Sequence, residues 1–332
     1  MTTTAPAQTP TAEQVLTRCR DLTRPALRSA VRSLHAWPAR MAAYSLGWCD
    51  RDGTPTLDPR AEGKGLRPTL TILAAEAAGA RTHTAIPGAV AVELVHVFSL
   101  LHDDIMDGDE KRRQRDTAWK TYGTGPAVLA GDALFALAVE TLTAAPAAHG
   151  TSALRHLSRA LRELIHGQSN DLLFETRPWT GPRAVSITEY RTMAEHKTGS
   201  LLGCATAIGA TLAGAPAHTV TALERFGRHL GVAFQAVDDL LGIWGDPATT
   251  GKPVHSDLRQ GKKTFPVLAA LSTDAPAAHE LATLLSSPPD PTTTHRAAAL
   301  IEEAGGRTAT LAEAEHHLTA ARHLLHTLPL TP

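Results

Sequence analysis

Apolar residues recur at helical spacing along nearly the whole chain, and this pattern predicts a protein built from helices. Alanine and leucine dominate, aromatic residues make up only 4% of the chain, and few stretches show the period of two that strands require. Segments rich in proline and glycine, such as RPWTGPR and SSPPDPTTT, separate the helical segments. Helices are expected near residues 11–35, 38–48, 67–79, 87–106, 124–144, 151–174, 187–213, 219–243, 264–272, 276–286, 294–304 and 309–327.

Two aspartate-rich segments, DDIMDGD at 103–109 and DDLLGIWGD at 238–246, close two of the expected helices. No fixed-period repeat is present, which weighs against a solenoid. We therefore expect one all-α domain over residues 12–330, a helical bundle with its site in the core. Residues 1–11 lack the basic and apolar regions of a secretory signal, and we expect a disordered tail there.

Composition narrows the class of partner. With 43% hydrophobic residues in 332, the chain can bury a large core, and 32 basic residues against 33 acidic ones leave no charge to recruit nucleic acid or an anionic membrane. The longest uncharged run, 198–220, is broken by Pro216 and suits a buried helix better than a membrane span. The three cysteines, Cys19, Cys49 and Cys204, lie far apart and indicate reduced thiols in a cytoplasmic protein.

The spacing of the aspartates points to metal chemistry. Asp103 and Asp107 are four residues apart and share one helix face, where their charges repel each other. A divalent cation removes that repulsion, and Mg²⁺ in particular binds carboxylates while bridging substrate phosphates. His96 lies two turns earlier on the same face. In the second segment Gly242, four residues after Asp238, stands where a third carboxylate would complete the DDxxD pattern.

Basic residues stand beside glycines at several separate points. Each of them alone is typical of a solvent-exposed surface charge. Together with the acidic segments, they predict a pocket for diphosphate. They are Lys64 and Arg67 in EGKGLRP, Arg112 and Arg113 after the first aspartates, Lys197 before Thr198, and Lys252, Lys262 and Lys263 in GKPVHSDLRQGKKT.

These segments, in this order, resemble the trans-type isoprenyl diphosphate synthases of the polyprenyl synthetase family. The resemblance implies the all-α isoprenoid synthase fold, a single-domain bundle around a central cavity, usually homodimeric and dependent on Mg²⁺. The matching segments are GKGLRP (63–68), ELVHVFSLLHDDIMDGDEKRR (93–113), GQSNDL (167–172), KTG (197–199), FQAVDDLLGIWGD (234–246) and GKPVHSDLRQGKKTFP (251–266).

By this resemblance the active site holds three Mg²⁺ ions. Asp103 and Asp107 would bind two of them on the allylic diphosphate, with Asp104 in support, and Asp238 would bind the third with Asp239 close by. The residues implied for the allylic diphosphate are Arg112, Lys197 and Lys252, and those for isopentenyl diphosphate are Lys64, Arg67, His96 and Arg113. Further substrate-binding positions are Thr198, Gln235 and Lys262, and Gln168 also matches a position that lines the cavity.

The implied reaction is the head-to-tail (1'-4) condensation of isopentenyl diphosphate with an allylic diphosphate, which lengthens a trans prenyl chain by five carbons. Phe98 and Ser99 lie about one turn before Asp103, where the resemblance implies the floor of the cavity. The small Ser99 leaves room that a second aromatic would close, and DDIMD carries no insertion. We expect geranylgeranyl diphosphate as the main product.

Two other functions stay open. A class I terpene cyclase on the same fold would ionise one diphosphate without condensing it, but it has no use for a second diphosphate site. A non-catalytic partner subunit of a heteromeric synthase would not require an intact first DDxxD. For the second segment we expect Asp238→Ala nearly to abolish activity and Gly242→Asp to have a modest effect. His255, where the family usually has glycine, is interpreted as drift.

Overall fold

The computed structural model describes residues 10–56, 62–145, 147–247, 253–287 and 290–331 of the chain. It is an all-α fold, as predicted. The first part of the chain forms α1 (Ala12–Arg32), α2 (Ala36–Ser45), α3 (Leu66–Ala77), the 3₁₀ turn η2 (Thr82–Ala85), α4 (Ile86–Met106), strands β1 (Lys111–Arg112) and β2 (Arg115–Asp116), α5 (Ala118–Tyr122) and α6 (Thr124–Thr143). The second part forms α7 (Ala147–Glu175), α8 (Ile187–Ala194), the π-helical segment η3 (Glu195–Gly199), α9 (Ser200–Leu212), α10 (Ala217–Trp244), α12 (Ser256–Arg259), α13 (Phe265–Leu271), α14 (Pro276–Leu285), α15 (Pro291–Glu303) and α16 (Gly306–His326).

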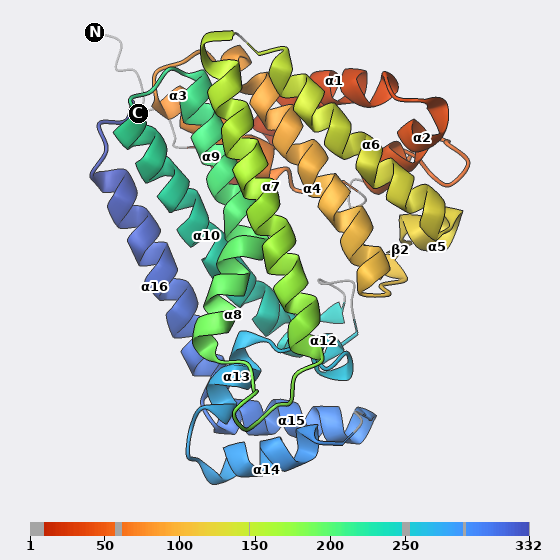
Figure 1. The fold of residues 1–332 in the computed structure, drawn as a ribbon, viewed down its shortest axis with the longest axis vertical. Coiled ribbons are helices and arrows are strands. Elements are labelled where there is room, and N and C mark those ends of the chain that lie inside the picture. The colour runs from red at the N-terminus through yellow and green to blue at the C-terminus, as the bar shows by residue number, and fades with distance from the viewer. Residues whose placement is uncertain (1–9, 57–61, 146, 248–252, 288–289, 332) are drawn as a thin grey trace, which may run out of the picture.

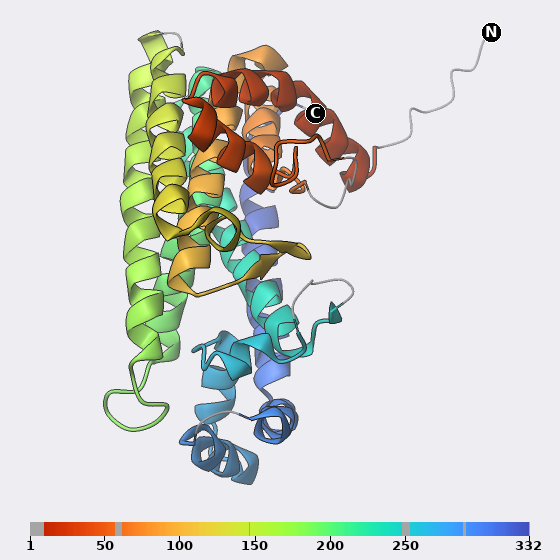
Figure 2. The same ribbon diagram turned by 90° about the vertical axis from the view of Figure 1, so that its right-hand side faces the viewer.

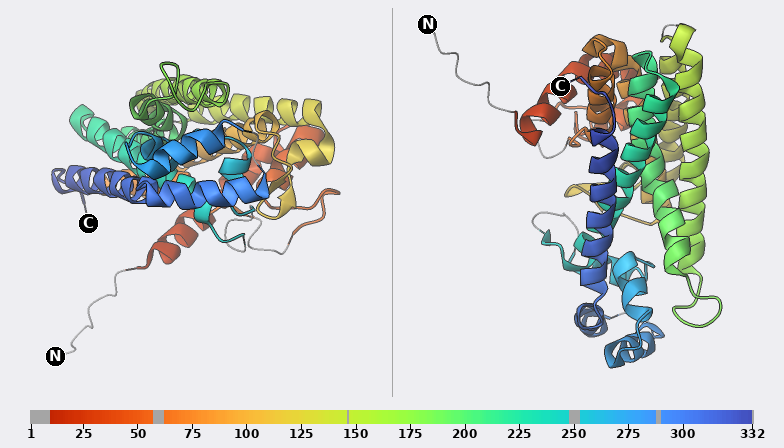
Figure 3. Two further views of the ribbon diagram at one scale, coloured as in Figure 1. Left: turned by 90° about the horizontal axis from the view of Figure 1, so that it is seen from below. Right: turned by 90° about the vertical axis from the view of Figure 1, so that its left-hand side faces the viewer.

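Six long helices, α4, α6, α7, α9, α10 and α16, run along the long axis of the molecule (Figure 1). Helix α9 packs against α3, α7 and α10, while α4 pairs with α6 and α10 with α16 (Figures 1 and 3). The main core lies between these helices and includes Leu94, Leu134, Leu157 and Leu202, all essentially inaccessible to solvent. The helices α13, α14 and α15 form a smaller cluster with its own core at one end of the bundle.

The N-terminal boundary of the first helix follows from local chemistry. Thr11 and Gln14 form a capping box, in which each side chain bonds to the backbone N–H of the other and satisfies donors that a helix start leaves open. The expected tail at 1–11 falls mostly on residues outside the described part of the chain, so it stays a prediction.

Three features differ from the pattern-based prediction. The expected continuous helix at 187–213 contains the π-helical segment η3 between α8 and α9. A two-stranded hairpin, β1–β2, follows α4 and is clearly visible in Figure 2. The short helices α5 and α12 were not expected. All three are too short to produce a hydrophobic period, so tertiary contacts decide them.

Two helical stretches among the described residues are long and apolar enough to cross a membrane by length and composition, Thr82–Met106 and Thr124–Thr143. The first is 56% buried within the bundle and the second 39%. The first also carries aspartates at its end, and it belongs to the main core. Both are therefore interpreted as helices of the bundle.

Candidate active site

A cavity of about 440 Å³ opens where α4, α7, α8, η3 and α10 converge. Both aspartate segments face it, through Asp103 of α4, Asp107 at the C-cap of this helix, and Asp238 and Asp239 of α10. Other predicted site residues that line it are Arg67, His96, Ser99, Arg112, Arg113, Lys197, Thr198, Gln235 and Lys262. Lys64, Phe98 and Asp104 are not among its lining residues, and Lys252 lies outside the described residues.

The carboxylates at the end of α4 have the chemistry of a cation site. Burial raises the pKa of Asp103 to about 6, although the nearby Lys197 opposes this shift. Asp107 forms an ion pair with Lys262, 2.7 Å from Nζ to Oδ2, while its Oδ1 is buried and accepts no hydrogen bond. The carboxylate oxygens of Asp103 and Asp107 are hard ligands of the kind that Mg²⁺ prefers. Among the described residues no three acidic, histidine or cysteine side chains could hold a metal by themselves, so a bound cation would need further ligands from substrate or water.

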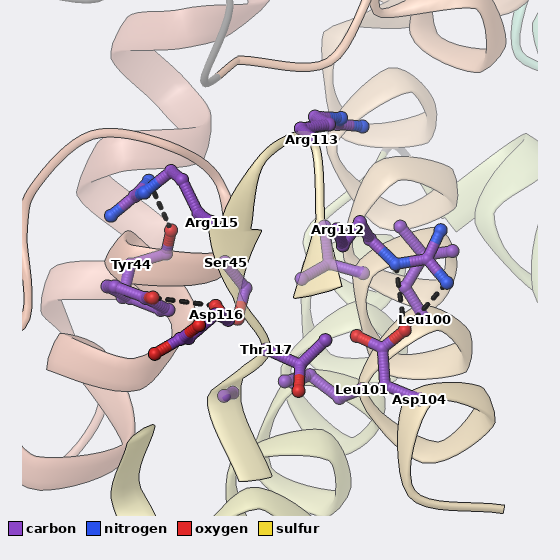
Figure 4. A pocket seen from close by; sticks show the side chains of 12 residues that line it. Tyr44, Ser45, Leu100, Leu101, Asp104, Arg112, Arg113, Arg115, Asp116 and Thr117 are labelled. Atoms are coloured by element: carbon purple, nitrogen blue, oxygen red, sulfur yellow. Dashed lines mark hydrogen bonds and ion pairs between the residues drawn. The ribbon is translucent and has the colours of Figure 1, made fainter. Parts of the chain in front are cut away.

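Asp104, unlike Asp103, does not line this cavity and holds Arg112 instead. The guanidinium donates from Nε to Oδ1 at 2.8 Å, and Nη2 lies 2.6 Å from the same oxygen (Figure 4). Asp104 is only 5% exposed, so this pair is a buried, charge-assisted contact that orients Arg112. A supporting role for Asp104 agrees with this geometry better than direct metal binding.

The hairpin that carries the arginine pair turns at Arg113 and Gln114, which both have positive φ (50° and 63°). Two such residues between short strands are typical of a type I′ turn, and non-glycine residues there carry strain that is common at functional sites. Tyr44 of α2 fixes the hairpin, because its hydroxyl donates to the carbonyl of Asp116 at 2.6 Å and its ring lies under Arg115 (Figure 4).

A second basic region lies deeper along α4. Burial and the neighbouring Arg67 and Arg113 hold the pKa of His96 well below its usual value, so its imidazole is neutral. Burial also raises the pKa of Glu93, whose carboxyl interacts with the same two arginines. The glycine-rich turn reaches this region, since a Cβ at Gly63 would lie 3.0 Å from Arg113 Nη2.

The π-helical segment η3 presents Lys197 and Thr198 to the cavity. Lys197 pairs with Asp171 of α7 at 2.5 Å, and Thr198 donates to Gln235 at 2.6 Å. Helix α7 approaches η3 closely because Gly167 has no side chain, and a Cβ there would lie 2.3 Å from the backbone N of Lys197. Asp171 was missed as a site residue, although it stands inside the quoted segment GQSNDL. In the same segment, both amide atoms of Gln168 are buried without a hydrogen-bond partner.

The two aspartates on α10 have different environments. Asp238 is exposed to the cavity. Asp239 is buried and accepts hydrogen bonds from the Tyr190 hydroxyl, from Phe265 N at 2.8 Å and from Gln235 Nε2 at 3.0 Å. Burial raises the pKa of Asp239 to about 7, against these hydrogen bonds. Asp239 therefore ties α8, α10 and α13 together, and Asp238 is the residue of the pair that can reach a ligand.

The segment from α12 to α13 crosses between the two aspartate segments. Lys262 reaches Asp107, and Gln260 donates to Asp109 at 3.0 Å. Lys263 also lines the cavity, with its ammonium 3.6 Å from the centre of the Trp179 ring, and burial lowers its pKa to about 8.

An all-α bundle whose cavity carries acidic residues at two helix ends and basic residues around them defines a class of enzymes that ionise diphosphate esters. The family model for polyprenyl synthetase matches residues 58–304. The chain belongs to the polyprenyl synthetase family, whose members are prenyltransferases.

Named relatives agree with this assignment. The chain is 47% identical to a (2E,6E)-farnesyl diphosphate synthase of Mycobacterium bovis, over 92% of this chain and 84% of the relative. It is 44% identical to a geranylgeranyl diphosphate synthase of Mycobacterium tuberculosis, over 92% and 87%. The crystal structure of a polyprenyl synthetase from Streptomyces coelicolor is similar with a TM-score of 0.88 and 47% identity, covering 96% of this chain and 94% of the other.

Proposed function

We propose that this prenyltransferase condenses isopentenyl diphosphate with an allylic diphosphate and makes geranylgeranyl diphosphate as its main product. The observation that carries the proposal is that one cavity holds two separate groups of cationic or neutral polar diphosphate ligands. Arg112 and Lys197 lie with the aspartates, and Arg67, His96 and Arg113 lie together deeper along α4. An enzyme that only ionises one diphosphate does not need the second group.

In the first step the allylic C1–O bond breaks, and its electron pair leaves with the diphosphate. Mg²⁺ held by the aspartates would supply positive charge to neutralise this leaving group. Arg112 and Lys197 act on the same charge, and their partners, the buried Asp104 and the partly buried Asp171, hold them in position beforehand. Three ions per site are proposed, with Asp103, Asp107 and Asp238 as the carboxylates that reach them.

In the second step the double bond of isopentenyl diphosphate attacks the allylic cation, forming the new C–C bond. A proton is then lost to the departing diphosphate, which leaves a prenyl diphosphate five carbons longer. Arg67, Arg113 and His96 bind the diphosphate of isopentenyl diphosphate, and because its low pKa keeps His96 neutral, the imidazole can donate one hydrogen bond without adding a third positive charge. Lys64 is exposed in the neighbouring turn and is proposed as a more peripheral contact. The proposed role of Lys252 falls outside the described residues.

Product length is the most specific part of the proposal. The named relatives do not decide it, because they include both a farnesyl and a geranylgeranyl diphosphate synthase. The support is local. Ser99 lines the cavity, while Phe98 turns toward α6 and packs on His102 and Phe135, with ring centres 4.8 and 5.7 Å away. A small residue on the cavity wall with an aromatic pair behind it suits a chain longer than farnesyl.

Incubating the purified chain with Mg²⁺, isopentenyl diphosphate and each of the allylic starters in turn, followed by product sizing, tests the proposal. We expect geranylgeranyl diphosphate, and no product when a chelator removes the metal. A hydrocarbon formed from an allylic diphosphate alone would instead favour the cyclase. No turnover with any starter, together with activity restored by a second protein, would favour the partner subunit.

The assembly and compartment are also proposals. Four large apolar side chains on α6 and α7 are more than a third exposed, which supports a homodimer. The near-neutral formal charge of −1 and the free cysteines suit a cytoplasmic enzyme whose partners are its substrates and no nucleic acid.

A further inference from the structure

The space beside Gly242 is already filled by a carboxylate from another element. A Cβ added at Gly242 would lie 2.0 Å from Oδ2, 2.4 Å from Cγ and 2.7 Å from Oδ1 of Asp257. Real Cβ atoms do not approach a neighbour this closely, so any side chain at position 242 would have to displace Asp257. The glycine and the aspartate therefore form one unit, although fifteen residues separate them in sequence.

Local contacts hold Asp257 in this place. Ser256 donates from Oγ to the carbonyl of Gly242 and to Oδ1 of Asp257, both at 3.2 Å. The backbone carbonyl of Asp257 accepts from the N–H of Lys262 at 2.9 Å. The residue that starts the turn, His255, has a φ of 61°, and this left-handed conformation explains why glycine would suit the position. Helix α12 is thus fastened to the end of α10 with its aspartate inward.

The position of Asp257 matches the missing member of the second DDxxD pattern. Residues 238 and 242 are four apart on α10 and lie on one face of it. Asp238, Gly242 and Asp257 all line the cavity. The carboxylate of Asp257 occupies the volume into which an aspartate side chain at position 242 would project.

We propose that Asp257 supplies the third carboxylate of the second aspartate segment, and that Gly242 is present to admit it. With Asp238, Asp257 positions the divalent cation and its water ligands on the α10 side of the substrate diphosphate. This inference rests on the proposed Mg²⁺-dependent function and identifies a residue that completes the metal site. Two elements, α10 and α12, then share a site that the motif normally places on one helix.

The proposal changes the expected effect of the substitutions. A modest effect of Gly242→Asp was expected when position 242 was considered alone. In the structure the new side chain would compete for space and charge with Asp257, so Gly242→Asp is expected to weaken cation binding about as strongly as Asp257→Asn does. The double variant Gly242→Asp with Asp257→Gly moves the carboxylate back onto α10, and it is expected to bind better than either single change.

A direct measurement of Mn²⁺ binding tests the role of Asp257 without relying on turnover. Mn²⁺ is titrated into the full-length enzyme in the presence of inorganic diphosphate, and bound and free ion are separated by electron paramagnetic resonance. Asp257→Asn is expected to lower the diphosphate-dependent Mn²⁺ affinity about tenfold or more, as is common for residues that orient metal ligands. Asp274→Asn, which removes a fully exposed carboxylate outside the cavity, is the matched control and should bind like the wild type.

The possible results distinguish the role of Asp257 from the proposed metal-dependent function. Wild-type enzyme that binds no Mn²⁺ with diphosphate would contradict the proposed metal-dependent function itself. Binding by the wild type that is unchanged in Asp257→Asn would overturn the role of Asp257. Circular dichroism confirms folding of each variant. If the double variant does not fold, the Mn²⁺ affinity of the isosteric variant Asp257→Asn alone decides whether Asp257 contributes to cation binding.

Discussion

At the scale of single residues, the burial of the Asp103 carboxylate suits cation binding but lowers the stability of the metal-free protein. Its pKa rises from an ordinary 3.8 to about 6 because the cavity wall removes water from the carboxylate. Since the pKa of Asp103 in the folded protein lies above that in the unfolded chain, the favourable contribution of Asp103 to the free energy of unfolding is complete below pH 3.8. It is lost as the pH rises through 6. At neutral pH the metal-free protein therefore carries a charge that costs free energy.

Removing this charge is expected to stabilise the metal-free enzyme while abolishing activity. Asp103→Asn should raise the free energy of unfolding by about 1–3 kcal/mol at pH 7.5, given about 1.4 kcal/mol per pKa unit. The gain should vanish near pH 4, where Asp103 is itself protonated. Urea unfolding at both pH values in the presence of a chelator measures it. Equal stability of both proteins at pH 7.5 would contradict the argument.

Phe98 tests the proposed floor of the cavity. Phe98→Ala removes the ring that packs on Phe135 behind Ser99, and the products are expected to lengthen by at least one isoprene unit. Phe226→Ala is the control, because Phe226 is, like Phe98, a half-buried ring packed on the main core outside the cavity lining, but it stands on α10 and is not next to Ser99. The products formed with isopentenyl diphosphate are sized for both variants. An unchanged chain length in Phe98→Ala would show that Phe98 does not limit the product.

Residues that belong to a local motif could be predicted from the sequence, and those that act across the fold could not. Asp103, Asp107 and Lys197 stand in short segments with a recognisable pattern. Asp257 and Tyr190 reach the site only because α12 and α8 pack against α10, and no periodicity encodes such a contact. For Asp257 the sequence offered one indirect signal, since Gly242 stands where the DDxxD pattern has a carboxylate and Asp257 fills the space beside it.

At the scale of elements, the π-helical segment η3 is where the predicted helix 187–213 departs from regular geometry. Its five residues, EHKTG, include no hydrophobic side chain, so the apolar positions of α8 and α9 on either side predict one helix and give no sign of the wider turn between them. The segment matters for the site, since its Lys197 and Thr198 both line the cavity. The sequence thus predicted the helix but not the π-helical turn within it.

Gly167 is expected to control the position of η3. In Gly167→Ala the new methyl group would lie 2.3 Å from the backbone N of Lys197, and backbone cannot rotate away. Helix α7 must shift, at a cost of about 1–3 kcal/mol typical of overpacking, and turnover should fall as Lys197 moves. Thermal unfolding and steady-state kinetics measure the two effects.

A matched glycine gives the control. Gly125 lies near the start of α6, and nothing lies within 4 Å of a Cβ added there. Gly125→Ala should therefore be neutral or slightly stabilising, by up to about 1 kcal/mol, with normal turnover. If Gly167→Ala were as stable and active as Gly125→Ala, close packing of α7 on η3 would have no functional role.

At the scale of the whole molecule, large apolar side chains remain exposed on two adjacent helices. They are Leu129 (59%) and Phe135 (39%) on α6, and Ile165 (55%) and Leu173 (60%) on α7. Leu129→Glu combined with Ile165→Glu places two charges on this surface, and burying them in an interface would cost several kcal/mol. The variant should be monomeric by light scattering under conditions where the wild type is a dimer. Leu311→Glu on α16, at a site equally exposed (53%), should remain dimeric, and a monomeric wild type would contradict the proposed assembly.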